Sequence, residues 1–398
     1  MTRLAKRLAG LEESVTLLIT AKAAELRAQG RDIIGFGAGE PDFDTPENIK
    51  EAAIKAIRDG KTKYTPVGGI PELKDAVRAK FSRDNSLDYR RDEVIVSCGG
   101  KHSIFNLFQA VLEPGDEIII PAPYWVSYPV MAALAGATPV IVQTTEAEGF
   151  KMSPEVFAAH ITKATKAVVI NSPSNPTGAA YTEAELRRLA EIALRNKVLV
   201  ITDEIYEELA YDGFKNTSIA STLNELKANC VVLNGVSKAY AMTGWRIGYA
   251  AGPTEIIKAM TSIQSQSTSN PASISQWAAV EALNGSQAFI PAMVKEFQAR
   301  RDTMVSALNA IPNVSAFKPQ GAFYVFAKVS GLYGKASAGR VINGSAELAT
   351  WLLDTVGIAV VPGSAFGNDA YVRLSYATSM KNIAEGIKRL GTAAAMLG

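Results

Sequence analysis

The sequence predicts an α/β fold whose core is a mostly parallel sheet between helices. Three apolar runs, at residues 167–170, 198–201 and 230–233, have the length of short strands and are rich in Val and Ile. Continuous apolar runs are typical of strands that are buried on both faces. Helix-length segments separate the runs, which favours neighbouring parallel strands joined by crossover helices. We therefore expect the polar residues that follow each run to meet at one edge of the sheet.

The N-terminal part is predicted to contain a helix over Val15–Ala28, a strand over Asp32–Phe36 and a second helix over Glu47–Ile57. The glycines in Gly35–Gly39 invite a dinucleotide-binding interpretation. That interpretation fails, because such a motif needs a helix that opens at its last glycine, and here residues 40–44 intervene.

Further along, a strand over Glu93–Ser97 leads through Gly99-Gly100 into a helix over Lys101–Leu112. A glycine pair that opens a helix exposes backbone N–H groups at the positive end of the helix dipole, which suits a phosphate. An ordinary strand-to-helix connection has the same pattern. Another strand, Ile118–Ile120, precedes Trp125, an indole that either stacks on a ligand or packs in the core.

The second half of the chain is predicted to hold helices over 183–195 and 254–263 and a long helical stretch from Pro271 to about Ala310. Strands are expected at 323–326, 358–361 and 372–375, mixed with helices in an α+β pattern. We expect a large domain over 46–295 and a smaller α+β domain formed by 1–45 with 296–398.

Composition excludes several classes of protein. Forty-one basic and 39 acidic side chains leave a net charge of +2, too small to indicate nucleic acid or an anionic membrane as a partner. Cys98 and Cys230 show no disulfide or metal-ligand spacing, so we expect free thiols and no metal ion. Without a signal peptide or a membrane-length apolar stretch, the expected location is the cytoplasm.

Lys238 follows the third apolar run and the turn Asn234-Gly235, at the expected carboxyl edge of the sheet. Trp245 and Arg246 come soon after it. Loss of solvent and a nearby positive charge both lower the pKa of a lysine and make its amine a better nucleophile. Taken alone, the same residues also fit a solvated surface lysine.

The other two runs lead into Asn175, and into Asp203 and Tyr206. Parallel neighbouring strands would bring these groups to the edge where Lys238 lies. Arg373 lies inside the apolar strand pattern of 372–375, where a permanent charge needs an anion. A bidentate contact with a carboxylate provides one, and a structural ion pair is the alternative.

The chain resembles class I aminotransferases of the pyridoxal phosphate fold type I, in particular bacterial aspartate aminotransferases of the thermophile-type subgroup. The resemblance spans nearly the whole length. It rests on several stretches in the family's order: Gly37–Phe43, Asn171–Gly178, Thr202–Tyr206, Ser237–Gly248 and Arg373–Ala377.

The resemblance implies pyridoxal 5'-phosphate as cofactor, joined to Lys238, which also acts as general base and acid. Asp203 would keep the pyridine nitrogen protonated, and Asn175 and Tyr206 would bind the phenolic oxygen. Trp125 would stack on the ring. The remaining implied cofactor contacts are Gly99, Gly100, Lys101, Ser237, Arg246 and, from the other subunit of a homodimer, Tyr64.

For the substrate, the resemblance implies that Arg373 binds the α-carboxylate near the backbone of Gly39, with Trp125 and Asn175 beside it. The best-known aspartate enzymes bind the second carboxylate with an arginine in the region that matches Ser262–Asn270, which has none here. The related subgroup uses a lysine and hydroxyls, matched here by Lys101 and Thr16.

The implied reaction transfers the amino group of aspartate to 2-oxoglutarate by a ping-pong route, an activity of amino-acid metabolism. Alternatives within the family are alanine, aromatic, kynurenine or prephenate specificity. The position that carries a lysine in prephenate-using members holds Glu12 here, which argues against prephenate. A cofactor-dependent lyase or decarboxylase is a further alternative. An aminotransferase-like transcription regulator is disfavoured, because such proteins carry an added DNA-binding domain and this chain has no room for one before Gly39.

Overall fold

The structure is a computed structural model that describes residues 5–8, 15–337 and 340–397. Its α-helices are α1 Val15–Ala28, α2 Glu47–Arg58, α3 Pro71–Asn85, α4 Gly100–Val111, α5 Ser127–Leu134, α6 Pro154–His160, α7 Glu183–Asn196, α8 Thr254–Ser265, α9 Ser273–Asn284, α10 Phe289–Asn309, α11 Ser345–Val356 and α12 Met380–Met396. Its strands are β1 Ile34–Gly35, β2 Val94–Ser97, β3 Glu117–Ala122, β4 Thr138–Gln143, β5 Thr165–Asn171, β6 Leu199–Asp203, β7 Cys230–Gly235, β8 Gly248–Ala251, β9 Ser315–Ala316, β10 Tyr324–Lys328, β11 Ala336–Ser337, β12 Arg340–Val341, β13 Ile358–Ala359, β14 Val361–Pro362 and β15 Tyr371–Ser375. Within these ranges, no helix has the length and apolar character needed to cross a membrane.

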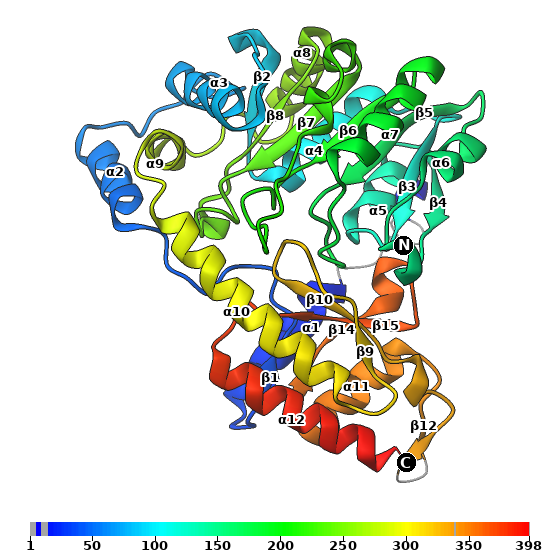
Figure 1. Ribbon diagram of the computed structural model, residues 1–398. Coiled ribbons are helices and arrows are strands. Elements are labelled where there is room, and N and C mark those ends of the chain that lie inside the picture. The colour runs from blue at the N-terminus through cyan, green and yellow to red at the C-terminus, as the bar shows by residue number, and fades with distance from the viewer. Residues whose placement is uncertain (1–4, 9–14, 338–339, 398) are drawn as a thin grey trace.

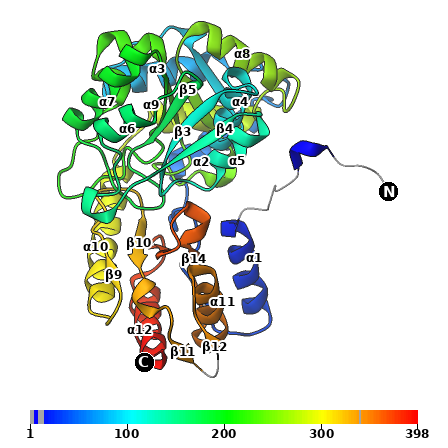
Figure 2. The same ribbon diagram turned by 90° about the vertical axis from the view of Figure 1, so that its right-hand side faces the viewer.

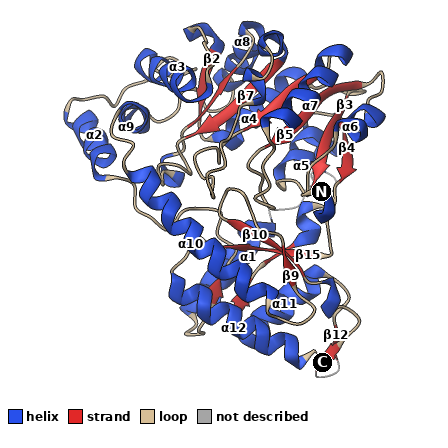
Figure 3. Cartoon of the chain, in the orientation of Figure 1, coloured by secondary structure: helices blue, strands red, loops and turns tan. Residues whose placement is uncertain are grey.

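A seven-stranded sheet in the order β2-β8-β7-β6-β5-β3-β4 forms the centre of the upper part of Figure 1. The neighbours from β7 to β4 run parallel, and β8 is antiparallel to both β7 and β2. Helices lie on both faces of this sheet (Figure 3). The three apolar runs are the adjacent strands β5, β6 and β7, which confirms the predicted α/β fold with a mostly parallel sheet.

Burial on both faces explains why these runs are continuous. In β5, Val168 and Ile170 belong to one apolar cluster, and Ala167 and Val169 belong to another. Each of the four is at most 2% exposed. Successive side chains of a strand point to opposite faces, so the two clusters are the cores on the two sides of the sheet.

The lower part of Figure 1 contains a four-stranded antiparallel sheet, β14-β15-β10-β9, together with α10, α11 and α12. α1 contacts β1, β13 and β14, and in Figure 2 it lies beside this lower part. α10 runs unbroken from the upper part into the lower part (Figure 1). The domain boundary expected at 295/296 falls inside this helix, and the proposed domain limits stay a prediction.

Two details of the sequence-based prediction were wrong. The long helical stretch expected to end near Ala310 is two helices, because α9 stops at Gly285, which adopts an extended conformation (φ −78°, ψ −164°). The strand expected over 358–361 is two short strands in different sheets, since β13 pairs with β1 and β14 pairs with β15.

Candidate active site

The candidate active site lies at the carboxyl ends of β5, β6 and β7. Asn171 and Asp203, the last residues of β5 and β6, are directly opposite each other in the register, and Lys238 follows β7 by three residues. Polar residues from these strand ends and residues from the lower part of the molecule line a cavity of about 340 Å³. This is the edge at which open α/β sheets bind ligands.

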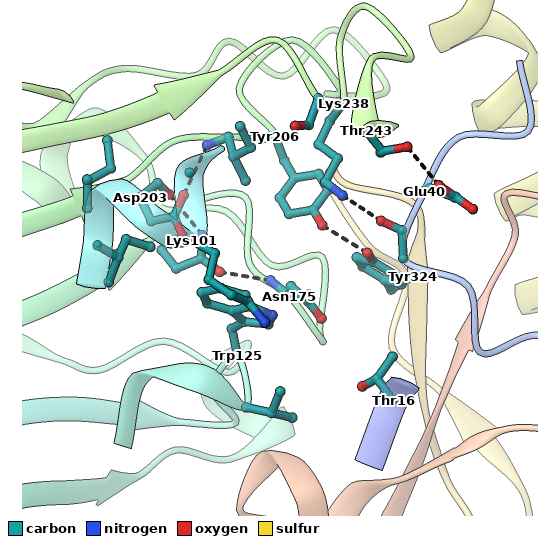
Figure 4. A pocket seen from close by; sticks show the side chains of 18 of the residues that line it. Thr16, Glu40, Lys101, Trp125, Asn175, Asp203, Tyr206, Lys238, Thr243 and Tyr324 are labelled. Carbon is teal, nitrogen blue, oxygen red and sulfur yellow. Dashed lines mark hydrogen bonds between the residues drawn. The ribbon is translucent and has the colours of Figure 1, made fainter. Parts of the chain in front are cut away.

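Most of the predicted residues line this cavity. They are Thr16, Gly39, Gly100, Lys101, Trp125, Asn175, Asp203, Tyr206, Ser237, Lys238, Arg246 and Arg373. Figure 4 shows how several of them face one another.

The Lys238 amine points into the cavity, where it donates a hydrogen bond to the carbonyl oxygen of Gly39 at 2.5 Å (Figure 4). Burial lowers the pKa of Lys238 to about 8; Glu40 opposes this shift, and Arg373 adds to it. A substantial fraction of the amine is therefore neutral near physiological pH. The prediction that Lys238 occupies a desolvated, cationic setting agrees with this geometry.

Asp203 is buried and has few partners for its charge. The hydroxyl of Tyr128 donates to its Oδ2 at 2.6 Å, and the backbone N–H of Ile205 donates to Oδ1 at 3.3 Å. Burial raises the pKa of Asp203, whereas the Tyr128 hydrogen bond lowers it. A buried carboxylate in this setting is stabilised by a cation placed against it from the cavity side.

Arg373 lies in β15 and is 2% exposed. Its Nη1 donates to Asn175 Oδ1 at 3.0 Å, and its Nη2 donates to the carbonyl oxygen of Gly37 at 2.8 Å. Nε has no hydrogen-bond partner among the described residues. No acidic side chain of the described chain forms an ion pair with Arg373. An anion entering the cavity would supply the missing charge, which argues against the alternative of a structural ion pair.

The start of α4 and the Arg246 guanidinium form one wall of the cavity. Gly99 precedes α4 with φ +92°, and a Cβ atom at this position would collide with the Arg246 guanidinium. A Cβ atom at Gly248 would likewise collide with the backbone of Gly100. Glycine at these positions lets Arg246 and the first amides of α4 lie together, a donor set that suits a phosphate.

Lys101 and Trp125 lie on the opposite side of the cavity from Lys238 (Figure 4). The Lys101 amine is 5.1 Å from the centre of the Trp125 ring. Thr16, in the first turn of α1, also lines the cavity. Two predicted residues do not line the cavity. Gly99 lies against the guanidinium of Arg246, and Tyr64 is 92% exposed. Glu12 is outside the described residues.

Comparison with known proteins identifies the family. The model of "Aminotransferase class I and II" matches residues 31–390. The chain belongs to this family.

Relatives of this aminotransferase match nearly the full length. A probable aspartate/prephenate aminotransferase of Rickettsia bellii is 52% identical and covers 100% of both chains. An aspartate aminotransferase of Bacillus sp. (strain YM-2) is 52% identical over 97% of this chain and 98% of its own. The structure of an aspartate aminotransferase from Thermus thermophilus with maleate has a TM-score of 0.93 and 46% identity, and covers 98% of this chain and 100% of its own. These findings confirm the predicted family and its fold.

The family implies pyridoxal phosphate, and the residues of this aminotransferase fit it. Arg246 and the first amides of α4 suit the phosphate, and the partly neutral Lys238 amine suits the aldehyde. Asp203 is a buried carboxylate that a protonated ring nitrogen would pair with.

Several cavity residues were missed by the sequence analysis. The hydroxyl of Tyr128 donates a hydrogen bond to Asp203, and that of Thr243 donates one to Glu40 at 2.7 Å. The hydroxyls of Tyr324 and Tyr206 are hydrogen-bonded to each other. A signal existed for Tyr128, which follows the predicted site residue Trp125 by only three residues. Tyr324 lies 118 residues from Tyr206 in the chain, so only the fold brings them together.

Proposed function

We propose that this aminotransferase transfers the amino group of aspartate to 2-oxoglutarate, with pyridoxal phosphate bound at Lys238. The observation that carries the proposal is one cavity into which the Lys238 amine, the Asp203 carboxylate and the Arg373 guanidinium all face. The names of the full-length relatives support the choice of aspartate.

The protein's own groups have separable tasks in this reaction. Bound pyridoxal phosphate supplies an electron-accepting ring that stabilises the charge left on the substrate's α-carbon after its proton is removed. Lys238 moves that proton as general base and then as general acid. Asp203 favours the protonated ring nitrogen, and Asn175 and Tyr206 are the proposed donors to the phenolic oxygen. Arg373 orients the substrate through its α-carboxylate.

The charges that line the cavity support a dicarboxylic substrate. Four cationic side chains, Lys101, Lys238, Arg246 and Arg373, face two carboxylates, those of Glu40 and Asp203. Arg246 is assigned to the phosphate, Arg373 to the α-carboxylate and Lys238 to proton transfer. Lys101, with the Thr16 hydroxyl, is then available for the second carboxylate of aspartate.

A homodimer with shared sites is part of the proposal. Tyr64, the residue assigned to the phosphate of the other subunit, is 92% exposed. Large apolar side chains are also exposed on the neighbouring α2, at Ile57, and on α1, at Leu17 and Leu18. Burial of these side chains against a second subunit would remove apolar surface from water. The cytoplasmic location suggested by the free thiols of Cys98 and Cys230 also stays a prediction.

Prephenate is a second candidate substrate, favoured by the name of the Rickettsia bellii relative, a probable aspartate/prephenate aminotransferase. The test for both is a screen of single half-reactions: the holoenzyme is mixed with one amino acid, and the loss of its visible absorbance is followed. Aspartate should convert the bound cofactor stoichiometrically to its aminated form, and prephenate should convert the aminated form back if it is an acceptor. Release of ammonia or carbon dioxide without amination would instead indicate a lyase or decarboxylase and overturn the proposal.

A further inference from the structure

Tyr324 is a fully buried residue of β10 that connects two groups of the candidate site. Its hydroxyl oxygen lies 2.9 Å from that of Tyr206 (Figure 4). The face of its ring lies against the guanidinium of Arg373, 4.3 Å from the ring centre to Cζ. One side chain therefore contacts both the proposed donor to the cofactor and the proposed anchor of the substrate.

The hydroxyl pair can pass a hydrogen bond in either direction. Burial raises the pKa of both Tyr206 and Tyr324, so both phenols stay protonated at neutral pH. Either O–H can be the donor in the bond between them. If Tyr206 donates to an acceptor in the cavity, its oxygen can accept from Tyr324 at the same time. Hydrogen bonds linked in this way strengthen one another.

The ring of Tyr324 limits how Arg373 can move. Phe366 lies on the same guanidinium, 5.0 Å from its ring centre to Cζ. In the β10–β15 register, Phe326 is opposite Arg373 and Tyr324 is opposite Ser375, which places Tyr324 diagonal to Arg373. A cation held against aromatic faces keeps its plane while its edge donates hydrogen bonds.

We propose that Tyr324 is a positioning residue of this aminotransferase. Its hydroxyl turns the proton of Tyr206 toward the phenolic oxygen of the cofactor, and its ring holds the guanidinium plane of Arg373 for the α-carboxylate. The inference rests on the proposed function. The charged groups that face the pair from the surrounding elements are Asp203, Lys238, Arg373 and Glu40.

Three variants separate the two contacts. Tyr324→Phe removes the hydroxyl and keeps the ring, Tyr324→Leu removes both, and Tyr206→Phe removes the partner. Tyr376→Phe is the matched control, because Tyr376 is fully buried in the same apolar cluster and its hydroxyl donates to Ala322 O at 3.1 Å, away from the cavity. The first readout is the pH midpoint of the visible absorbance of the holoenzyme. The second is the Kd of succinate, a dicarboxylate that has no amino group to transfer.

Tyr324→Phe should raise the absorbance midpoint by about 0.3 to 1 pH unit, the equivalent of one hydrogen bond. Without the Tyr324 hydroxyl, Tyr206 donates a weaker hydrogen bond to the phenolic oxygen of the cofactor, so the form of the cofactor with a deprotonated phenolic oxygen is stabilised less. In the Tyr206→Phe background the same change should add no further shift. Tyr324→Phe should leave the Kd of succinate within about twofold of wild type, whereas Tyr324→Leu should raise it about 3- to 10-fold. Tyr376→Phe should change neither value.

Each part of the inference can be overturned separately. An unchanged midpoint in Tyr324→Phe, or additive shifts in the double variant, would show that the hydroxyl does not act through Tyr206. An unchanged succinate Kd in folded Tyr324→Leu would refute the role of the ring. If the wild-type holoenzyme has no visible absorbance band from a cofactor joined to Lys238, the proposed function fails, and this inference fails with it.

Discussion

Replacing Lys101 with alanine tests how the second carboxylate of aspartate is bound. Lys101 is the second residue of α4, and its amine lies 5.1 Å from the centre of the Trp125 ring. The change removes one cation from the cavity and leaves the α4 backbone, whose amides are assigned to the phosphate. We expect a loss of kcat/KM for aspartate and little change for alanine or phenylalanine.

The exposure of Lys101 sets the size of the effect. A hydrogen bond to a charged group is worth about 1.5 to 3 kcal/mol, and the value falls when the group is exposed to solvent. Because the Lys101 residue is exposed, we use the lower limit. About 1.5 kcal/mol corresponds to roughly a tenfold lower kcat/KM for aspartate. Salt should reduce the difference between wild type and variant, since it screens exposed charges.

The assay is the single half-reaction with aspartate, alanine and phenylalanine, measured for wild type, Lys101→Ala and the control Lys101→Met. Lys101→Met keeps an apolar stem against Trp125 and lacks the charge, so it should behave like Lys101→Ala. Equal losses for acidic and neutral substrates would refute the reasoning, because they would show that Lys101 only supports the phosphate-binding helix. Full activity of Lys101→Met would assign the effect to packing.

Three further outcomes follow from the structure. The rate at which the cofactor-free chain takes up pyridoxal phosphate should rise with pH through about 8 and then level off, because the Lys238 amine, whose pKa is lowered to about 8, must lose its proton. Stopped-flow absorbance measures this rate, and a flat pH profile from about pH 7 to 9 would contradict the prediction. Tyr128→Phe removes a hydrogen-bond donor to Asp203 and should raise the Kd of pyridoxal phosphate about tenfold in a fluorescence titration. An unchanged Kd would show that cofactor binding by Asp203 does not depend on the Tyr128 hydrogen bond. Lys80→Met leaves the carboxylate of Glu207, whose side chain is 10% exposed, without its ion-pair partner and should lower the free energy of unfolding by about 3 to 5 kcal/mol, measured with denaturant. Adding Glu207→Gln should restore part of this loss, and a double variant as unstable as Lys80→Met would attribute the loss to packing.

The sequence was sufficient for the parts of the fold that depend on local pattern. Buried parallel strands need apolar residues on both faces, so β5, β6 and β7 could be found from continuous runs. Pairing partners were less accessible, because apolar character does not specify them. Residues 358–361 form one apolar run, yet Ile358 pairs with Ile34 and Val361 pairs with Arg373 in a different sheet.

The same distinction applies to the candidate site. Lys238 and Asp203 could be located because Asp203 ends a recognisable strand and Lys238 comes soon after another, and strand ends meet at a sheet edge. Tyr324 could not be assigned, because its contact with Tyr206, 118 residues away in the chain, depends on tertiary packing. The role of Tyr64 depends on a second subunit and stays a prediction.

The site is assembled from two parts of the molecule, and their contacts bear on its chemistry. Lys238 follows β7 of the upper sheet by three residues, and Arg373 lies in β15 of the lower sheet. The segment between β1 and α2 joins them: the carbonyl oxygen of Gly37 accepts from Arg373, and that of Gly39 accepts from Lys238. In the proposed holoenzyme the Lys238 amine would be joined to the cofactor, so it would no longer be available in the same form for the hydrogen bond to Gly39. The Gly37–Gly39 backbone therefore contacts both the residue proposed to hold the cofactor and the residue proposed to bind the substrate carboxylate, so one short segment borders both proposed ligand positions.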